Sequence, residues 1–283
     1  MTREIAWNSE PSPVTLFEEN WRADTPAMHA RRSTLEAEMT RREWLRNAVF
    51  AASVWRPRGL HAHAGRLASM NMRSARDAVD HVLLGAADLD RAMAWFEART
   101  GVKPVFGGVH PGRGTRNALA SLGGRQYLEI IAPDPAQKAF SFQLDLRKLQ
   151  APKIVNWAVA SDDVDIPTAI AAKAKYAVYG PQEGSRMRPD GAMLQWRTVG
   201  VLAPFRDAEV DPMPFFIQWG SGVKHPSEDS PAGCRLAAFE LRHPEAAALR
   251  ALLAVFDIDA VVAQADRPGL TATLDTPRGK VML

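Results

Sequence analysis

The sequence predicts an α+β fold in which a β-α-β-β-β unit is repeated along the chain. Three observations indicate this. Short apolar runs typical of strands alternate with single amphipathic segments of helical period. A first unit over residues 79–135 has the same order of elements as a second over 154–220, and a third follows over 232–283. Repetition at this scale predicts stacked modules that bury a shared core.

The first unit opens with an apolar strand over 79–84 that carries one acid and one imidazole, Asp80 and His81. Asp88 is a good N-cap for the helix that follows, and Gly101 supplies the C-terminal stop. The remaining elements are expected to be a short strand at 105–106, a glycine-rich loop at 107–114, and strands at 115–122 and 127–132. The fourth strand carries Glu129 at its centre.

The second unit is expected to contain a strand at 154–160, a helix that opens at Asp163, and strands at 178–180, 192–199 and 214–220. Aligned on the repeat, Trp157 falls where His81 sits, and Gln218 falls where Glu129 sits.

The third unit follows a linker at 225–231 and is expected to contain a strand at 234–241, a helix that opens at 243–245, and strands at 260–262, 270–274 and 280–283. The predicted organisation is therefore a leader over 1–78, paired modules over 79–225 and a third module over 232–283.

Composition excludes several classes of protein. With 283 residues, 46% of them hydrophobic, the chain can bury a sizeable core. The single cysteine, Cys234, cannot form an internal disulfide or a cysteine-based zinc site. No apolar run approaches the length needed to span a bilayer. The net charge of +3 resides in residues 1–78, so the remainder is neutral and has no nucleic-acid footprint.

The leader contains a candidate targeting segment over residues 39–64. Its Met39 to Arg46 stretch resembles the twin-arginine export signal, with a short apolar core and a small-x-small cleavage site after it. The alternative is an Arg-rich amphipathic helix. A cytoplasmic protein is expected, or a periplasmic one if the segment acts as a signal.

His81 and Glu129 are solitary ionisable groups on apolar strands. Side chains alternate across a strand, so His81 points away from the face that carries Val82 and Leu84. A carboxylate within a buried strand is costly unless it is paired, protonated or metal-bound. Imidazole nitrogen and carboxylate oxygen both suit divalent ions such as Zn, Fe, Mn or Ni. Alternatively, the histidine is a satisfied core residue and the glutamate meets an arginine or a backbone donor.

Taken together, Asp80-His81 in the first strand and Tyr127-Leu128-Glu129 in the fourth resemble the vicinal oxygen chelate superfamily. Three further segments are similar, more narrowly, to its glyoxalase-like domain proteins: the Gly108 to Asn117 run, the Arg188 to Gly191 turn and the Phe215 to Gly220 strand. The similarity covers about residues 79–283.

The resemblance implies that two modules form a cupped mixed sheet around a divalent ion, with ligands from the first and fourth strands of each. His81 and Glu129 match the ligand positions of the first module. In the second module Trp157 cannot ligate, and Gln218 offers only an amide oxygen. The implied metal site is therefore His81, Glu129 and Gln218 with water. The missing second histidine argues against extradiol dioxygenase chemistry.

With a metal, the implied activity is Lewis-acid catalysis by a lyase, isomerase or oxygenase on a small oxygen-rich substrate. His110 is the candidate general acid or base, or else a loop histidine that caps its own turn. Arg113 and Arg116 are candidates to clamp a carboxylate, or are solvated. Asn117 is expected to face the cup, and Trp157 to provide an apolar floor for a flat ligand or to lie in the core.

A metal-free protein that binds or sequesters a small molecule in the same cup is the alternative function. The histidine and glutamate favour the enzyme, whereas Trp157 and Gln218 favour the binding protein. Modules of this kind assemble in pairs, so a homodimer is a further expectation. The third module extends the sheet at an edge, covers the mouth of the cup or meets a second chain.

Overall fold

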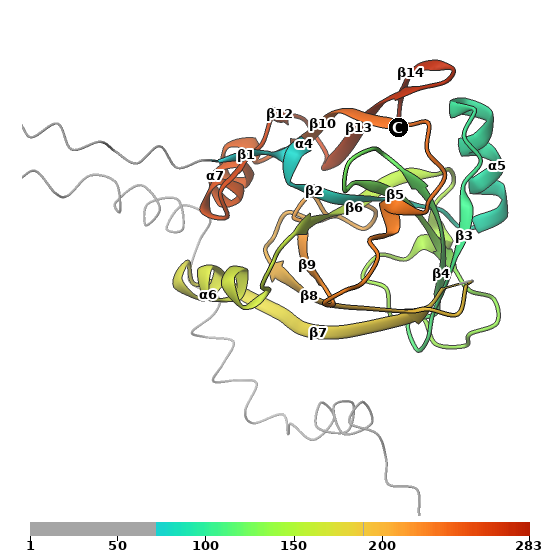
Figure 1. Ribbon diagram of the computed structural model, residues 1–283. Coiled ribbons are helices and arrows are strands. Elements are labelled where there is room, and N and C mark those ends of the chain that lie inside the picture. The colour runs from blue at the N-terminus through green and yellow to red at the C-terminus, as the bar shows by residue number, and fades with distance from the viewer. Residues whose placement is uncertain (1–71, 189) are drawn as a thin grey trace, which may run out of the picture. The chain divides into compact units, whose positions relative to one another are not determined.

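A curled, eight-stranded mixed sheet is the main feature of the structure, a computed structural model that describes residues 72–188 and 190–283 (Figure 1). Its strands lie in the order β3-β4-β5-β2-β6-β9-β8-β7. They are β2 (Val79–Gly85), β3 (Val105–His110), β4 (Thr115–Ser121), β5 (Tyr127–Pro133), β6 (Lys153–Ala160), β7 (Ala177–Met187), β8 (Met193–Leu202) and β9 (Phe215–Trp219). The candidate export signal at 39–64 lies outside the described residues.

Each half of the sheet contains one helix and four strands in the same order. In the first half β2 is followed by helix α5 (Leu89–Thr100) and then by β3, β4 and β5; in the second, β6 is followed by α6 (Asp165–Lys173) and then by β7, β8 and β9. The last strand of each half pairs in parallel with its first, and the two first strands pair antiparallel at the centre. The predicted α+β fold with a cupped mixed sheet is confirmed.

Helix α5 begins and ends where the sequence predicts. The side chain of Asp88 accepts a hydrogen bond from the backbone N–H of Arg91, which satisfies a free donor of the first turn. Gly101 ends the helix with a φ of 77°, a left-handed conformation that glycine adopts without steric cost.

The glycine-rich segment at 107–114 was predicted to be a loop, and this is wrong for its first half, because β3 continues to His110. The β3–β4 register shifts between Phe106 and Gly108, so Gly107 is the extra residue of a β-bulge. A Cβ on Gly107 would lie 2.5 Å from Oδ1 of Asn117. Glycine here leaves room for a side chain of the neighbouring strand.

The two edges of the curled sheet, β3 and β7, lie near each other (Figure 1). The guanidinium of Arg186 on β7 donates a hydrogen bond across the gap to the backbone oxygen of Gly107 on β3. The second edge strand is much longer than the predicted segment at 178–180, since it runs from Ala177 to Met187. The sheet thus approaches a closed barrel around an interior.

The third unit forms a separate four-stranded sheet. Its elements are β10 (Arg235–His243), α7 (Ala246–Val255), β11 (Ile258–Asp259), β12 (Val262–Gln264), β13 (Gly269–Thr276) and β14 (Gly279–Met282). The strand order is β12-β10-β13-β14, with β10 between its partners, whereas the first strand of each half of the large sheet pairs with the fourth. Strand β11 is not part of this sheet and pairs in parallel with β1 (Arg73–Ser74). The unit therefore has one strand more than the predicted β-α-β-β-β order, and it pairs its strands differently.

This small sheet packs on the outer face of the large one. The rings of Trp157 on β6 and Phe239 on β10 lie 5.1 Å apart, and both belong to the main hydrophobic core. Val82 and Leu84 point into the same core. The third unit is thus on the side opposite the cup, so it neither extends the large sheet at an edge nor covers the mouth of the cup, while contact with a second chain stays a prediction.

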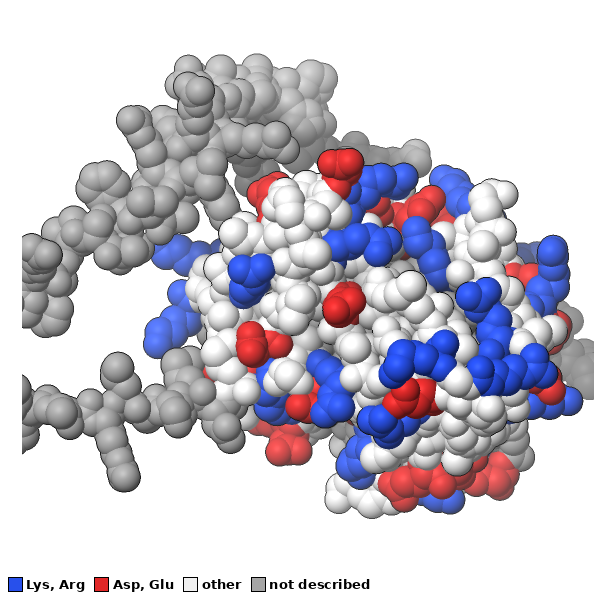
Figure 2. All heavy atoms as spheres, turned by 90° about the horizontal axis from the view of Figure 1, so that it is seen from above, with Lys and Arg blue, Asp and Glu red and all other residues white. Residues whose placement is uncertain are grey.

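Short elements complete the structure: β1 (Arg73–Ser74), α4 (Ala75–Ala78) and the 3₁₀ turns η1 (Leu146–Lys148) and η2 (Pro226–Glu228). None of the helices in the described ranges has the length and hydropathy needed to cross a membrane. Basic and acidic side chains are interspersed on the face shown in Figure 2.

Candidate functional site

The concave side of the large sheet encloses a cavity of about 340 Å³. Both halves of the sheet contribute to its lining, as does the segment between β5 and η1. The polar lining residues include His81, His110, Arg113, Thr115, Asn117, Glu129, Asn156, Gln182 and Arg186, and the aromatic ones include Tyr127, Phe142, Tyr179, Trp196, Phe215 and Trp219. Most of the polar chemistry comes from the first half and most of the aromatic surface from the second.

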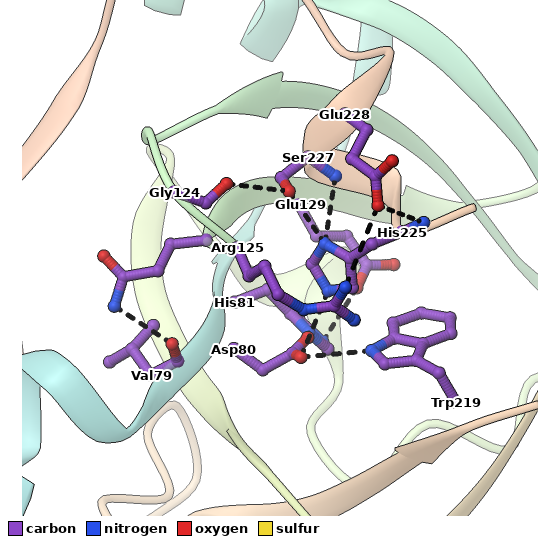
Figure 3. A network of polar contacts seen from close by, with 11 residues as sticks. Val79, Asp80, His81, Gly124, Arg125, Glu129, Trp219, His225, Ser227 and Glu228 are labelled. Atoms are coloured by element: carbon purple, nitrogen blue, oxygen red, sulfur yellow. Dashed lines mark hydrogen bonds and ion pairs between the residues drawn. The ribbon is translucent and has the colours of Figure 1, made fainter. Parts of the chain in front are cut away.

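Asp80 lies beneath the cavity and orients His81. The β2–β6 register shifts between Val79 and His81, so Asp80 is the extra residue of a β-bulge. Its Oδ1 accepts a hydrogen bond from Nδ1 of His81 at 2.8 Å. Its Oδ2 accepts hydrogen bonds from Nε1 of Trp219 at 3.0 Å and Nε2 of His225 at 3.2 Å (Figure 3). A carboxylate that accepts from three ring nitrogens fixes the proton of His81 on Nδ1 and leaves Nε2 with its lone pair.

The charge on Asp80 is stable despite its burial. Burial by itself raises the pKa of this carboxyl, which is only 2% exposed, but the hydrogen bonds from His225 and His81 outweigh it and hold the pKa well below its usual range. Asp80 is therefore an anion at every pH at which the protein is expected to function.

Glu129 and His81 face each other in the cavity. Nε2 of His81 lies 3.5 Å from Oε2 of Glu129, and both residues are buried. The other carboxylate oxygen, Oε1, accepts a hydrogen bond of 2.7 Å from Nδ2 of Asn117. The facing atoms are both hydrogen-bond acceptors when Nδ1 of His81 carries the proton. Such a pair is stable only with a proton or a metal ion between the two atoms.

His110 is the third ionisable side chain of this group. Its Nδ1 lies 2.8 Å from Oγ1 of Thr115, while its Nε2 lies 3.7 Å from Oε1 of Glu129 and 3.4 Å from Nδ2 of Asn117. Burial lowers the pKa of His110, and the charge of Glu129 opposes that shift without reversing it. His110 is therefore neutral near pH 7, as a general base requires.

Three of the predicted site residues lie outside the cavity. Gln218 lies on the other face of β9, where its Oε1 accepts from Nη1 of Arg197 and the backbone N–H of Val164, both at 3.3 Å. Trp157 is fully buried in the main hydrophobic core, on the convex side of the large sheet. Arg116 points towards α5 and pairs with Asp90 at 3.4 Å.

The first two corrections have one physical cause. In the β2–β6 pairing Trp157 lies opposite Val82, and its neighbour Asn156 lies opposite Leu83, which lines the cavity. On β9 the cavity is lined by Ile217 and Trp219, on either side of Gln218. Because side chains alternate along a strand, an alignment that is one residue out places every side chain on the wrong face.

Sequence reasoning also missed residues of the site. Arg186 lines the cavity from an edge strand whose length was underestimated, and Asn156 was hidden by the alignment that selected its neighbour. The alternation of Gln182, Gly184 and Arg186 is the signal that identifies the inner face of β7, once the strand is known to extend that far.

The donor set fits two protein ligands of a divalent ion. Two ligands that are each about 2.1 Å from an ion, at a tetrahedral angle, lie about 3.4 Å apart. The 3.5 Å between Nε2 of His81 and Oε2 of Glu129 is close to that value. Within residues 72–188 and 190–283, no group of three His, Cys, Asp or Glu side chains is arranged to hold a metal. Further ligands would therefore be water or substrate.

The sequence matches the family model of the glyoxalase-like domain over residues 79–256. A solved structure of a hypothetical protein from Staphylococcus aureus is similar over 68% of this chain and 87% of its own, with 17% identity and a TM-score of 0.55, a likeness of fold. No curated protein matches the sequence.

Two methylmalonyl-CoA epimerase structures are also similar. The enzyme from Streptomyces coelicolor shares 20% identity over 50% of this chain and 96% of its own, with a TM-score of 0.37. The enzyme from Mycobacterium tuberculosis shares 20% identity over 52% and 89%, with a TM-score of 0.35.

Proposed function

The chain belongs to the glyoxalase-like domain family of the vicinal oxygen chelate superfamily, and we propose that it is a metal-dependent lyase or isomerase that acts on a small oxygen-rich substrate in the cup. Members of the superfamily are generally metal-dependent isomerases and lyases. His81 and Glu129 are the proposed ligands. The observation that carries the proposal is the pair of acceptor atoms, Nε2 of His81 and Oε2 of Glu129, facing each other at 3.5 Å.

Each side chain has a distinct role in this proposal. A bound divalent ion would supply Lewis-acid stabilisation of negative charge on a substrate oxygen. Asp80 holds the proton of His81 on Nδ1, so that Nε2 remains a ligand. Asn117 donates a hydrogen bond to Oε1 of Glu129, which keeps the other carboxylate oxygen, Oε2, directed towards His81.

Proton transfer is assigned to His110. With its Nδ1 proton donated to Oγ1 of Thr115, the ring presents a basic Nε2 to the substrate. The nearby N–H of Asn117, 3.4 Å from Nε2, favours a lone pair at that atom. A neutral histidine beside a stabilised oxyanion suits abstraction of a proton from a carbon next to a carbonyl group.

Elemental analysis of untagged protein tests the proposal. Wild type should retain about one equivalent of a divalent ion, whereas His81→Ala and Glu129→Gln should lose most of it. His243→Gln is the matched control, because that histidine is buried in the third unit and bonded to the backbone oxygen of Phe205. Retention of the ion by His81→Ala, or no ion in any sample after incubation with Zn²⁺, Mn²⁺ and Ni²⁺ in turn, would contradict the proposal.

A metal-free binding protein remains the second candidate. It is favoured by the small donor set, because no third His, Cys, Asp or Glu side chain in the described part of the chain is arranged with His81 and Glu129 to hold a metal ion. In that case a proton takes the place of the ion between His81 and Glu129, and the wild type binds small molecules without any metal.

A further inference from the structure

We propose that the ligand of this cavity is a carboxylic acid with an apolar, aromatic-sized body, and that Arg186 and Arg113 hold its carboxylate. The inference rests on the proposed function in taking the same cavity as the binding site, and it names the substrate class. It depends on no metal.

Arg186 is a buried cation without an anion. The residue is 5% exposed, and within residues 72–188 and 190–283 no carboxylate oxygen lies within 4.0 Å of its guanidinium nitrogens. Burial lowers its pKa, and the charge of Glu129 compensates only in part. Buried arginines are almost always paired with an acid, because removing an uncompensated charge from water is costly. The unpaired cation lines the cavity, so an anion that enters there would complete the pair.

The contact with β3 does not account for Arg186. The guanidinium donates one hydrogen bond, from Nη1 to the backbone oxygen of Gly107, and this links the two edges of the sheet. A guanidinium has five N–H donors in a planar fork. A neutral side chain could donate the same hydrogen bond to Gly107. The positive charge of Arg186 and its remaining N–H donors are therefore available to a ligand. A carboxylate matches that fork in shape and charge.

Arg113 provides a second cation at the cavity. It lies in the turn after β3, and its only side-chain hydrogen bond among the described residues is a long one, 3.4 Å from Nη2 to Oε1 of Gln182. Its own backbone oxygen accepts from the N–H of Ser141, which fixes the turn against the neighbouring segment. The cavity lining thus holds two arginines, Arg113 and Arg186, and one carboxylate, Glu129. This excess of positive charge favours an anionic ligand.

The rest of the cavity is shaped for an apolar body. Trp196 lies across Gly184, where an added Cβ would come within 2.3 Å of the indole Nε1. The ring of Trp219 follows at 6.0 Å, and Phe215 and Phe142 also line the cavity. A volume of about 340 Å³ is at the lower end for small-molecule sites. These surfaces suit a single-ring acid better than a polyanionic or nucleotide-bearing ligand.

Calorimetric titration with matched probes tests the inference. Benzoate, phenylacetate and phenylpyruvate are compared with benzamide, phenylacetamide and phenylacetone, which keep the ring but lack the charge. Each is titrated into chelator-treated protein and into metal-loaded protein. At least one acid should bind at least 10-fold more tightly than its neutral counterpart in both forms.

Four variants assign the binding to the arginines. Arg186→Met should weaken the best acid by about 10- to 100-fold, as expected for loss of a charge-assisted hydrogen bond. Arg113→Met should weaken it less. Arg186→Lys keeps the charge and loses the fork, so it should fall between wild type and Arg186→Met. Arg116→Met is the control and should bind as wild type does, because that guanidinium faces α5.

Several outcomes would overturn the inference. These are no binding by any of the acids, equal affinity for acids and neutral probes, or unchanged affinity in Arg186→Met. If Arg186→Met does not fold, unchanged affinity in both Arg186→Lys and Arg113→Met has the same meaning.

The two proposals fail separately. Acid binding that disappears with the metal and ignores Arg186 would overturn this inference and leave the metalloenzyme standing. If the protein never binds metal, and acid binding needs Arg186 but persists in His81→Ala, the metalloenzyme proposal is overturned and this inference stands.

Discussion

Replacing Asp80 by asparagine should convert His81 from a metal ligand into a hydrogen-bond donor. Asparagine keeps the shape of the carboxylate but has one acceptor oxygen and one NH₂ group. Two of the three donors around this position, Trp219 and His225, meet the same oxygen, Oδ2. The arrangement that loses fewest hydrogen bonds therefore places the amide oxygen there and the NH₂ group against Nδ1 of His81. His81 then accepts at Nδ1 and carries its proton on Nε2.

The magnitude follows from this tautomer change. Loss of a carboxylate that orients a ligating histidine typically lowers metal affinity by about 10- to 100-fold. The free energy of unfolding should fall by about 1–3 kcal/mol, because charge-assisted hydrogen bonds to a buried acceptor become neutral ones. The fold should survive, since no donor is left without a partner.

Titration of Co²⁺ or Zn²⁺ into chelator-treated protein, followed by calorimetry, measures the effect. Asp90→Asn is the matched control, because Asp90 is an exposed acid whose ion pair with Arg116 lies outside the cavity. If Asp80→Asn binds the ion as tightly as wild type does, the tautomer argument is refuted.

Three further predictions concern single side chains. His110→Gln should keep the metal content of wild type but slow the exchange of the C3 protons of phenylpyruvate with D₂O, followed by NMR, by at least about 100-fold; unchanged exchange would remove His110 as the base. Burial raises the pKa of Asp211 to about 6. The protonated carboxyl is therefore favoured in the folded protein, so the free energy of unfolding is highest below about pH 4 and falls as the pH rises through 6. In urea denaturation Asp211→Asn should therefore be about 3 kcal/mol more stable than wild type at pH 8, because the pKa shift is about two units, and about equal to it at pH 4. A gain that does not depend on pH would show another cause. Trp157→Ala should lower the free energy of unfolding by about 3–5 kcal/mol in the same assay. The reason is that the side chain is fully buried and its Nε1 donates to the backbone oxygen of Pro212. A loss of metal affinity without that destabilisation would show that Trp157 belongs to the metal site.

The site residues of the first unit could be predicted from the sequence. His81 and Glu129 stood out as single polar groups on apolar strands, and strand alternation placed His81 on the face opposite Val82 and Leu84, as the structure has it. Asp88 and Gly101 bounded the helix by local hydrogen bonding and backbone conformation alone. These predictions needed only local chemistry.

The positions of residues that depend on how distant strands pair could not be predicted in the same way. The bulge at Asp80 and the one at Gly107 each add a residue that nothing in the local sequence requires. An alignment of the two units without knowledge of strand register selected Trp157 and Gln218, and each is one residue from a side chain that does line the cavity.

Arg186 was missed for a different reason. Its segment contains glycine, proline and charged residues, and such a composition is typical of loops. The strand exists because Ala177 to Met187 pairs along nearly its whole length with β8. This pairing is a tertiary feature, so the inner position of Arg186 appears only in the folded structure.

The most direct test of the central claim is a crystal structure of the protein soaked with Mn²⁺ or Zn²⁺, with anomalous scattering used to locate the ion. The account predicts one strong peak in the cavity within bonding distance of both Nε2 of His81 and Oε2 of Glu129. Full loading of the crystal with no peak between these two atoms, or with the ion held elsewhere, would contradict it.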